Sequence, residues 1–272
     1  MIGELYLVPS PIGNLKDVSP RVMETLLKVD FIACEDTRNT SKLLNLLGIK
    51  DKKCFSCHEH NEKTSSNFIV KEILNGKNVA YLSDAGYPCI SDPGAILTIE
   101  AIKNDIKVVP LNGASAFLSA LIASGLDSEH FFFYGFLKSK ESERVNELKS
   151  LKNLPYTLLF YESPHRIKET LKDIYEVFGD RKIVVARELS KLHEEFIRTT
   201  LKEINASTTE LIGELVLVVE KASISDNRYS DNELIEKVNL LMKNGLSKKD
   251  AITSISLLLN VPKNEIKKIT IN

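Results

Sequence analysis

Short apolar runs alternate with helix-like segments through the first 112 residues, and this alternation constrains the fold more than any other feature of the sequence. The apolar runs have the length and composition of buried strands: ELYLV (4–8), DFIAC (30–34), KCFSC (53–57), VAYLS (79–83) and IKVVP (106–110). The segments between them carry apolar residues three or four positions apart, which is typical of helices packed on one face. Strands separated by helices predict a mainly parallel sheet covered by helices, and such a sheet binds ligands beyond the carboxyl ends of its strands.

The pattern changes after about residue 125, where strand-like runs follow one another more closely. These runs are FFFYGF (131–136), TLLFYES (157–163), KIVVAREL (182–189), EEFIRTT (194–200) and ELVLVVE (214–220). Short connections between the last three indicate antiparallel or mixed pairing, and hence a second α/β domain. The segment SPHRIKETLKDIYEVFG predicts a helix with Ser163 at its N-cap and Pro164 at its first position.

Three domains are therefore expected. They are an N-terminal α/β domain (1–113), a C-terminal mixed α/β domain (114–222) and a small helical tail resembling a helix-turn-helix (223–272), which opens with the polar linker SISDNRYSDN. The tail is either a packing module or a contact for nucleic acid, and the sequence leaves both alternatives open.

One loop is unusually rich in residues that control the backbone. Residues 83–94 read SDAGYPCISDPG, with two Asp, two Gly and two Pro in twelve positions. Gly permits positive φ angles and Pro fixes φ, so this punctuated loop has a specific path. Its place at the carboxyl end of a predicted strand favours a ligand site, although a rigid connection with capping Asp residues is the alternative. Other unusual loops leave the same edge of the sheet: PSPIGN (9–14), EDTRNT (35–40), HEHNE (58–62) and LNGASA (111–116).

Composition excludes several classes of protein. A hydrophobic content of 43% and a charged content of 27% exclude a disordered chain, and no apolar run reaches the ~20 residues of a membrane helix. The first residues lack a basic segment before a long apolar stretch, so we expect no secretory signal and a cytoplasmic protein. A net charge of −1 argues against a surface that binds nucleic acid throughout, although it leaves room for a local basic patch.

A metal site is not predicted. Cys54 and Cys57 form a CxxC motif close to His58 and His60, which could be read as a metal cluster. However, the segment looks like a strand, in which three-residue spacing points the two sulfurs to opposite faces. Cys34 and Cys89 are the other cysteines, and four cysteines in a chain of 272 residues do not suggest a disulfide scaffold.

The ligand is expected to lack phosphate groups. The sequence contains neither G-x-G-x-x-G after the first strand nor G-x-x-x-x-G-K-[ST], so neither common phosphate cradle is present. The two prolines of PSPIGN remove backbone donors that a pyrophosphate would need. S-adenosylmethionine fits this description, and so do many other small metabolites.

Several motifs together resemble a known family. They occur in one unbroken order between residue 4 and about residue 220: LYLVPSPIGNLKDVSPR, ACEDTRNTSKLL, HEHNE, SDAGYPCISDPG, LNGASAFLSALIASGL, FYGFL, FYESPHRI, ARELSKLHEEFIRTTL and GELVLVVE. This succession resembles the ribosomal RNA small-subunit 2′-O-ribose methyltransferases of the tetrapyrrole-methylase class. The resemblance implies an enzyme with two α/β domains that binds S-adenosylmethionine between them, acts as a homodimer, and methylates a cytidine in the decoding region of 16S rRNA in the small ribosomal subunit.

The resemblance also implies site residues, by motif. The cofactor-binding residues are then Pro9, Pro11, Ser83, Asp84, Ala85, Gly86, Ile90, Ser115 and Ala116, with Tyr161, Arg187 and Glu188 from the second domain, where Glu162 approaches the same cleft. This chain departs from the family pattern where DAGTP is replaced by DAGYP and PGPSA by NGASA. Tyr87 places a bulky ring where a small hydroxyl is usual, so the side-chain contacts at that position stay open.

Methyl transfer to a ribose oxygen depends mainly on holding donor and acceptor in position, and a base helps to remove the hydroxyl proton. The loops offer these candidate bases: Glu35, Asp36, His58, Glu162 and His165, of which we favour Asp36, Glu162 and His165 as catalytic. The alternative for Glu35 and Asp36 is capping of the helix that begins near Thr37. Arg38, Arg166 and Arg187 are predicted to clamp phosphate or carboxylate groups. The remaining substrate-binding candidates are Glu35, His58, His60 and Asn61.

Two other functions compete with this interpretation. One is a tetrapyrrole or other small-substrate methyltransferase on the same scaffold, and the other is a non-enzymatic RNA-binding regulator that uses the tail. The first loop favours the RNA branch, because tetrapyrrole enzymes of this class open with a glycine-richer loop that ends in Gly-Asp. With a net charge near zero, we expect recognition of a folded particle, with naked RNA a poor substrate.

Overall fold

The structure, a computed structural model, describes residues 1–223, 229–259 and 261–270. Part of the predicted polar linker, residues 224–228, lies outside this range. The chain forms two compact units: residues 1–151 with 156–220, and residues 152–155 with 221–272. Both predicted sheets belong to the first unit.

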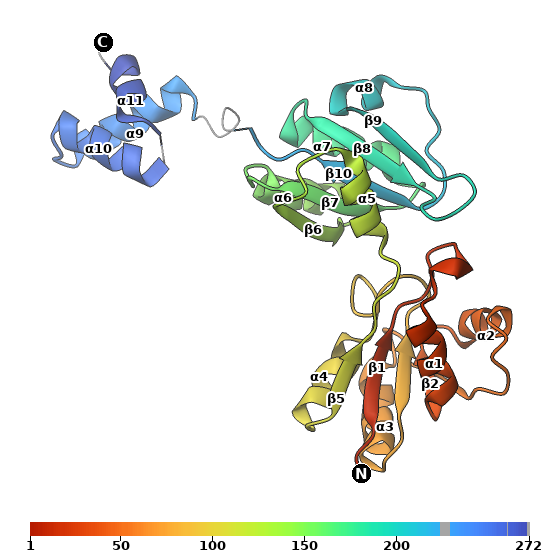
Figure 1. Cartoon of the computed structure of the whole chain (residues 1–272). Coiled ribbons are helices and arrows are strands. Elements are labelled where there is room, and N and C mark those ends of the chain that lie inside the picture. Colours follow the sequence, from red (N-terminus) through yellow and green to blue (C-terminus); the bar gives the residue numbers. More distant parts are fainter. Residues whose placement is uncertain (224–228, 260, 271–272) are drawn as a thin grey trace. The chain divides into compact units, whose positions relative to one another are not determined.

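The first sheet is parallel throughout, with the strand order β3-β2-β4-β1-β5 (Figure 1). Its strands are β1 (Glu4–Val8), β2 (Phe31–Cys34), β3 (Cys54–Ser56), β4 (Val79–Leu82) and β5 (Lys107–Pro110). The residues of β2 and β4 are all buried, as expected for central strands covered on both faces. The mainly parallel N-terminal sheet predicted from the alternation is thus confirmed.

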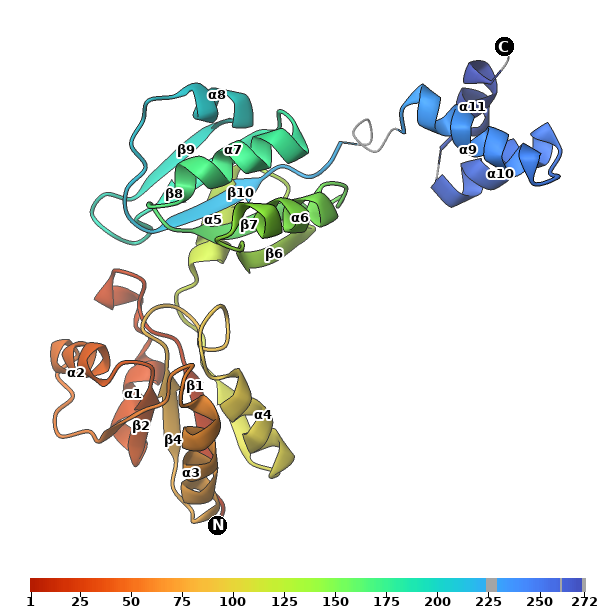
Figure 2. The same ribbon diagram turned by 180° about the vertical axis from the view of Figure 1, so that it is seen from behind.

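Helices cover both faces of this sheet. On one face lie α1 (Pro20–Lys28) and α2 (Thr37–Leu46), and on the other lie α3 (Glu62–Leu74) and α4 (Ala95–Lys103), as Figures 1 and 2 show from opposite sides. A short 3-10 helix, Leu15–Asp17, follows the first loop. Helix α1 begins as its sequence predicts, because the Ser19 side chain accepts a hydrogen bond from Val22 N and Pro20 occupies the first helical position.

The second sheet is mixed, with the order β6-β7-β10-β8-β9. Its strands are β6 (Phe131–Phe136), β7 (Thr157–Glu162), β8 (Lys182–Arg187), β9 (Glu195–Thr200) and β10 (Leu215–Val219). Strand β6 pairs parallel with β7, whereas β8, β9 and β10 pair antiparallel, which confirms the predicted mixed sheet. Helix α5 (Ala116–Ser124) packs on one face, and Figure 2 shows α6 (Glu141–Leu151) and α7 (Ile167–Phe178) over the other. Helix α8 (Leu201–Ala206) follows β9.

A buried ion pair joins α6 to α7. Arg144 Nε lies 2.6 Å from Asp173 Oδ2, and the two side chains are 2% and 3% exposed. Arg144 also donates to the backbone oxygen of Ser139 at 2.8 Å. The guanidinium therefore has partners for several of its donors, as a buried charge requires.

The beginning of α7 corrects the prediction. The helix starts at Ile167 with Arg166 at its N-cap, and not at Pro164. Residues 163–166 form a turn in which Arg166 N donates to the Ser163 oxygen at 3.2 Å. Because the Glu162 carboxylate accepts from both Ser163 N and the Arg166 guanidinium, this turn closes on the end of β7 before the helix can begin.

Three helices make up the predicted helical tail: α9 (Asp231–Lys243), α10 (Lys248–Leu259) and α11 (Lys263–Ile269). They pack around their own apolar core, which includes Leu234, Ala251 and Ile266. Ser230 and Glu233 form a reciprocal capping box at the start of α9.

Candidate functional site

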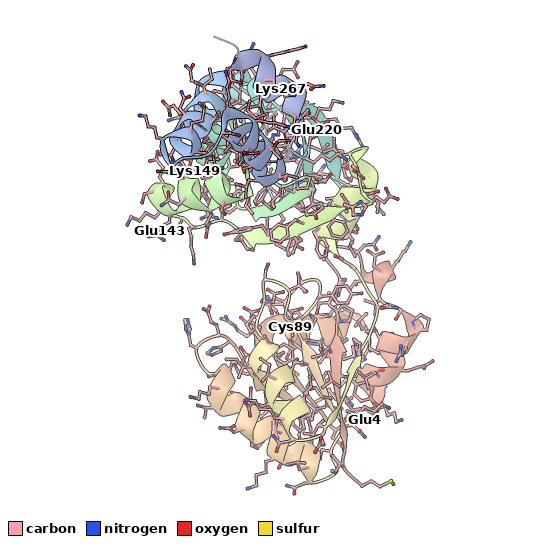
Figure 3. All side chains as sticks on the ribbon, turned by 90° about the vertical axis from the view of Figure 1, so that its left-hand side faces the viewer. Glu4, Cys89, Glu143, Lys149, Glu220 and Lys267 are labelled. Atoms are coloured by element: carbon pink, nitrogen blue, oxygen red, sulfur yellow. The ribbon has the colours of Figure 1, made fainter. Side chains whose placement is uncertain are left out.

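The punctuated loop and the first loop are joined by backbone hydrogen bonds. Ser10 and Gly86 exchange two of them, at 2.9 and 3.0 Å. Ser10 Oγ donates to the Ser83 oxygen at 2.6 Å, and Ser83 Oγ donates to the Gly86 oxygen at 3.0 Å. Figure 3 shows Cys89 of the punctuated loop at the end of the sheet opposite Glu4, where β1 begins. The two loops therefore form one connected structure at the carboxyl edge of the sheet.

The loop that follows β5 is held against the same structure. Gly113 N donates to the Tyr87 hydroxyl at 2.8 Å. A Cβ at Gly113 would lie only 2.4 Å from Pro9 Cγ, so the proline ring needs a glycine at this position. Tyr87, which replaces a small residue of the family pattern, thus joins the punctuated loop to LNGASA.

The end of the punctuated loop is anchored by Glu62. This carboxylate is 5% exposed, and its Oε1 accepts from Gly94 N, Ile96 N and Leu97 N at 2.9, 2.9 and 3.3 Å. It therefore caps the N-terminus of α4, where backbone donors lack intrahelical partners and the helix dipole favours a negative charge. The sequence analysis missed this role, although HEHNE had been singled out for other residues.

The punctuated loop contains a series of left-handed backbone conformations. Gly86 has φ 70° and Gly94 has φ 119°, and the non-glycine residues Cys89 and Ser91 have φ values of 68° and 60°. Side chains with a Cβ adopt this region at a cost, and such strain often accompanies a functional site. At Gly94 a Cβ would also lie 2.8 Å from the Tyr81 ring.

Next to this loop is a cavity of about 360 Å³. Loops that follow strands of the first sheet line it, together with the start of α5 and with strands and loops of the second sheet: Ile12, Ala85, Gly86, Tyr87, Ile90, Ser91, Asp92, Ser115, Ala116, Phe117, Phe136, Tyr161, Glu162, Ser163, Pro164, Leu189, Gly213, Glu214, Leu215 and Val216. Its walls are mostly apolar, with a few polar groups. This is the usual character of a small-molecule site.

Of the residues that the sequence analysis assigned to cofactor binding or catalysis, seven line this cavity. They are Ala85, Gly86, Ile90, Ser115, Ala116, Tyr161 and Glu162. Burial raises the pKa of Tyr161 to about 12, and the negative charge of Asp92 contributes to this shift.

The other predicted cofactor-binding residues, Pro9, Pro11, Ser83, Asp84, Arg187 and Glu188, do not line the cavity. Pro9 and Ser83 help to hold its loops, as described above. The Asp84 carboxylate is exposed and accepts from the Asn39 side chain at 2.7 Å. Arg187 Nε pairs with Glu195 Oε2 at 2.5 Å.

Glu188 supports the cavity wall from outside. Its Oε1 accepts from Glu214 N at 3.0 Å and from Lys191 Nζ at 2.9 Å. These hydrogen bonds lower the pKa of Glu188, the bond from the Glu214 backbone first. A Cβ at Gly213 would lie 2.4 Å from Glu188 Oε1, so the carboxylate packs directly on the turn that lines the cavity.

Asp36 caps helix α2. Its carboxylate accepts from Arg38 N at 2.7 Å and forms an ion pair with the Arg38 guanidinium, also at 2.7 Å. Hydrogen bonds from Arg38 hold the pKa of Asp36 well below its usual range, which makes the carboxylate a weak proton acceptor. Arg38 is 85% exposed. Neighbouring Glu35 has a raised pKa because it is partly buried and lies near the charge of Asp84.

The Glu162 side chain is buried, and both of its carboxylate oxygens accept hydrogen bonds. Its Oε1 accepts from Ser163 N at 2.7 Å and from Arg166 Nη2 at 2.8 Å, and its Oε2 accepts from Thr170 Oγ1 at 2.6 Å. The arrangement stabilises the turn after β7. His165, in the same turn, is exposed and does not line the cavity.

The histidines of HEHNE lie outside the cavity lining. The rings of His58 and His60 are 5.9 Å apart, edge to face. The buried Nδ1 of His58 has no hydrogen-bond partner among the described residues, while His60 is exposed. Asn61 folds onto its own loop, since its Oδ1 accepts from His58 N at 2.8 Å.

Asp92 is the cavity residue that the sequence analysis missed. Burial raises the pKa of its carboxyl to about 7, with further contributions from the charges of Glu35 and Asp84. A signal was present in the sequence, because Asp92 is the second Asp of the punctuated loop. The missed apolar lining residues, such as Phe136 and Val216, carry no signal that separates them from ordinary strand residues.

Within the part of the chain that the structure describes, no group of three or more His, Cys, Asp or Glu side chains is placed to hold a metal ion. In the same residues, no helix is both long and apolar enough to cross a membrane.

Solved structures with the same fold are known. The chain is similar to diphthine synthase, with a TM-score of 0.65 at 15% identity over 82% of this chain and 93% of that one. It is also similar to uroporphyrin III C-methyl transferase from Thermus thermophilus, with a TM-score of 0.57 at 16% identity over 81% of this chain and 98% of that one. At these identities the likeness concerns the fold alone.

Sequence relatives are much closer. Residues 4–205 match the family described as "Tetrapyrrole (Corrin/Porphyrin) Methylases". A protein of Bacillus subtilis named ribosomal RNA small subunit methyltransferase I is 46% identical, over 97% of this chain and 93% of its own length. A protein of Haemophilus influenzae with the same name is 41% identical, over 98% and 95%. The chain therefore belongs to the tetrapyrrole methylase family and, within it, to the ribosomal RNA small subunit methyltransferases I.

Proposed function

We propose that this methyltransferase uses S-adenosylmethionine to methylate the 2′-oxygen of a cytidine ribose in the decoding region of 16S rRNA, within the small ribosomal subunit. The observation that carries the proposal is an apolar cavity beside the punctuated loop, in a chain 46% identical to a relative named for small-subunit rRNA methylation. We further propose that the protein is cytoplasmic and forms a homodimer. Its proposed domains comprise residues 1–113, 114–222 and 223–272.

The residues of the cavity fit the proposed donor. A volume of about 360 Å³ with mostly apolar walls suits an adenosine and a short aliphatic chain. Small residues at Ala85, Gly86 and Ala116 leave backbone groups accessible, and these would hold the polar groups of the donor together with Ser115. The Asp92 carboxylate supplies a negative group in a cavity that would hold a positively charged sulfur. When bound, S-adenosylmethionine supplies an electrophilic methyl group.

The protein contributes to methyl transfer mainly by holding the donor and the acceptor in position. Hydrogen bonds among Ser10, Ser83 and Gly86, and between Gly113 and Tyr87, hold three loops of the cavity in one arrangement. Rigid walls favour near-attack geometry, and apolar walls exclude water that would compete with the ribose hydroxyl.

RNA contacts are proposed for the residues outside the cavity. The charged and polar candidates are Glu35, Arg38, His58, His60, Asn61 and Arg166. Arg38 is more accessible than Arg166, with 85% of its side chain exposed against 25%, although it pairs with Asp36. Its guanidinium can exchange that carboxylate for a phosphate at little cost, because an exposed ion pair adds little stability.

The proposal is tested by transfer of labelled methyl groups. Purified protein and labelled S-adenosylmethionine are incubated with small subunits from cells that lack this protein, and the labelled nucleoside is identified after digestion of the rRNA. We expect one labelled 2′-O-methylcytidine in the decoding region and much weaker labelling of protein-free 16S rRNA. Label on a base, or no label on the small subunits, would refute the proposal.

A further inference from the structure

Asp92 lines the cavity, and its carboxylate has no hydrogen-bond or ion-pair partner among the described residues. In this it differs from the other acidic side chains at the site. It follows the left-handed Ser91, which turns the chain at this point, and it lines the cavity together with Tyr161. Among the described residues no donor hydrogen-bonds to its side chain. A half-buried carboxylate without donors is costly for the fold, and such groups concentrate at functional sites.

The other acidic side chains near the cavity already have hydrogen-bond or ion-pair partners. Glu162 lines the cavity, but its two oxygens accept hydrogen bonds from the turn after β7 and from Thr170. Asp36 caps α2 and pairs with Arg38. Glu188 supports the Glu214 backbone from outside the lining. Glu214 does line the cavity, but its carboxylate pairs with Lys191 at 3.1 Å.

We infer that Asp92 is the catalytic base that accepts the proton of the acceptor hydroxyl. This inference rests on the proposed function, because it assumes a ribose hydroxyl as acceptor. As the ribose oxygen forms its bond to the methyl carbon, the bond between that carbon and the donor sulfur breaks. The sulfur keeps the electron pair and becomes a neutral thioether, the hydroxyl proton passes to the Asp92 carboxylate, and solvent later removes it.

The surroundings of Asp92 suit this task. The charged groups that act on it are Glu35 and Asp84, which follow β2 and β4, and both favour its protonated form, as does burial. The charge of Asp92 in turn influences Tyr161 of β7 and Cys89 of the same loop, and both stay neutral at physiological pH because their own pKa values are raised. With a pKa of about 7, Asp92 is ionised in a useful fraction at neutral pH and still basic enough to take a proton. A positively charged donor in the cavity would lower this pKa and favour the ionised form further.

The test separates binding from transfer. Asp92→Asn keeps the shape of the side chain and removes the basic oxygen, and Asp92→Glu restores a carboxylate. Asp105→Asn is a matched control, because Asp105 is an exposed acid in a left-handed conformation at the opposite edge of the first sheet. For each variant, the dissociation constant of S-adenosylmethionine is measured by calorimetry, and kcat and kcat/KM for transfer to small subunits are measured between pH 5.5 and 9.

For Asp92→Asn we expect donor binding to weaken by no more than about tenfold, because the lost charge favours the cationic donor, and kcat at saturating donor to fall by about 10²–10⁴-fold. The unsubstituted protein and Asp105→Asn should show kcat/KM rising with pH to a plateau, with an inflection near 7; Asp92→Asn should show none, and Asp92→Glu should recover part of the rate. A kcat within threefold in Asp92→Asn, or an unchanged inflection, overturns the inference. So does a loss of donor binding that accounts for the lower rate. If the unsubstituted protein transfers no label to small subunits, the proposed function itself fails, and the inference fails with it.

Discussion

The Tyr87 hydroxyl accepts a hydrogen bond from Gly113 N at 2.8 Å, and this bond joins two loops that both border the cavity. Tyr87 lines the cavity, and its hydroxyl reaches the loop after β5. The family pattern has a small residue at this position. In this chain the Tyr87 side chain therefore connects the punctuated loop to the loop that precedes α5.

Tyr87→Phe should loosen this connection without removing the ring. Loss of one hydrogen bond leaves Gly113 N without its partner and costs about 1 kcal/mol, so the dissociation constant of S-adenosylmethionine should rise about fivefold. Calorimetry measures the effect, and Tyr156→Phe serves as control because Tyr156 does not line the cavity. Equal affinities in Tyr87→Phe and the unsubstituted protein would show that the two loops hold their positions independently.

Glu62→Gln should destabilise the fold. The substitution keeps an oxygen that can accept hydrogen bonds, but it removes the charge that three N–H groups at the start of α4 share. We expect the free energy of unfolding in urea to fall by about 1–2 kcal/mol. Glu59→Gln, an exposed acid in the same loop, should change it by less than about 0.5 kcal/mol. Similar values for the two variants would contradict the capping role of Glu62.

Both sheets were predictable from the sequence for a simple reason. Strands buried on both faces appear as short apolar runs, and β2 and β4 of the first sheet and β10 of the second are such strands. Gly and Pro in residues 83–94 also predicted a shaped loop at the carboxyl edge, and the backbone angles of Gly86 and Gly94 agree. These features are local, so one sequence is enough to identify them.

Other features depend on contacts between distant segments, and the sequence did not predict them. Glu62 caps a helix that begins 33 positions later, at Ala95. Phe136 and Val216 line the cavity, but within their strands they look like core residues. The start of α7 was misplaced because the Glu162 side chain, from the preceding strand, holds residues 163–166 in a turn.

Arg144→Met should be among the most destabilising single substitutions in the second sheet and its helices. It leaves the buried Asp173 carboxylate without its ion-pair partner, and this should lower the free energy of unfolding by about 3–5 kcal/mol. Lys172→Met serves as control, because it removes the exposed ion-pair partner of Glu176 in α7, the helix that carries Asp173. It should lower the free energy of unfolding by less than about 1 kcal/mol. A double variant, Arg144→Met with Asp173→Leu, should recover much of the loss; failure to do so would mean that the packing of Arg144 matters more than its charge.

Asp92 should make stability depend on pH. Its pKa is about 7 in the folded chain and near the ordinary value of Asp when unfolded, so the folded state binds the proton more tightly. This contribution to stability is complete below about pH 4, is lost as pH rises to about 7, and stays lost above that. Asp92→Asn should therefore be more stable than the unsubstituted protein at pH 8, by about 1–2 kcal/mol after allowance for the partial exposure of the carboxylate, with a smaller difference at pH 5. Urea unfolding at the two pH values measures this, and equal differences would show that the Asp92 carboxylate is as well solvated in the folded chain as in the unfolded one.

In the proposed function, the cavity beside the punctuated loop holds the methyl donor. Calorimetric titration of S-adenosylmethionine into Ala116→Phe, which fills the cavity from the start of α5, tests it most directly, with Ile122→Phe on the exposed side of the same helix as control. We expect Ala116→Phe to bind the donor at least about tenfold more weakly, a loss of about 1.4 kcal/mol, and Ile122→Phe to bind it as the unsubstituted protein does. Undiminished binding by a stably folded Ala116→Phe would place the donor elsewhere and contradict the account.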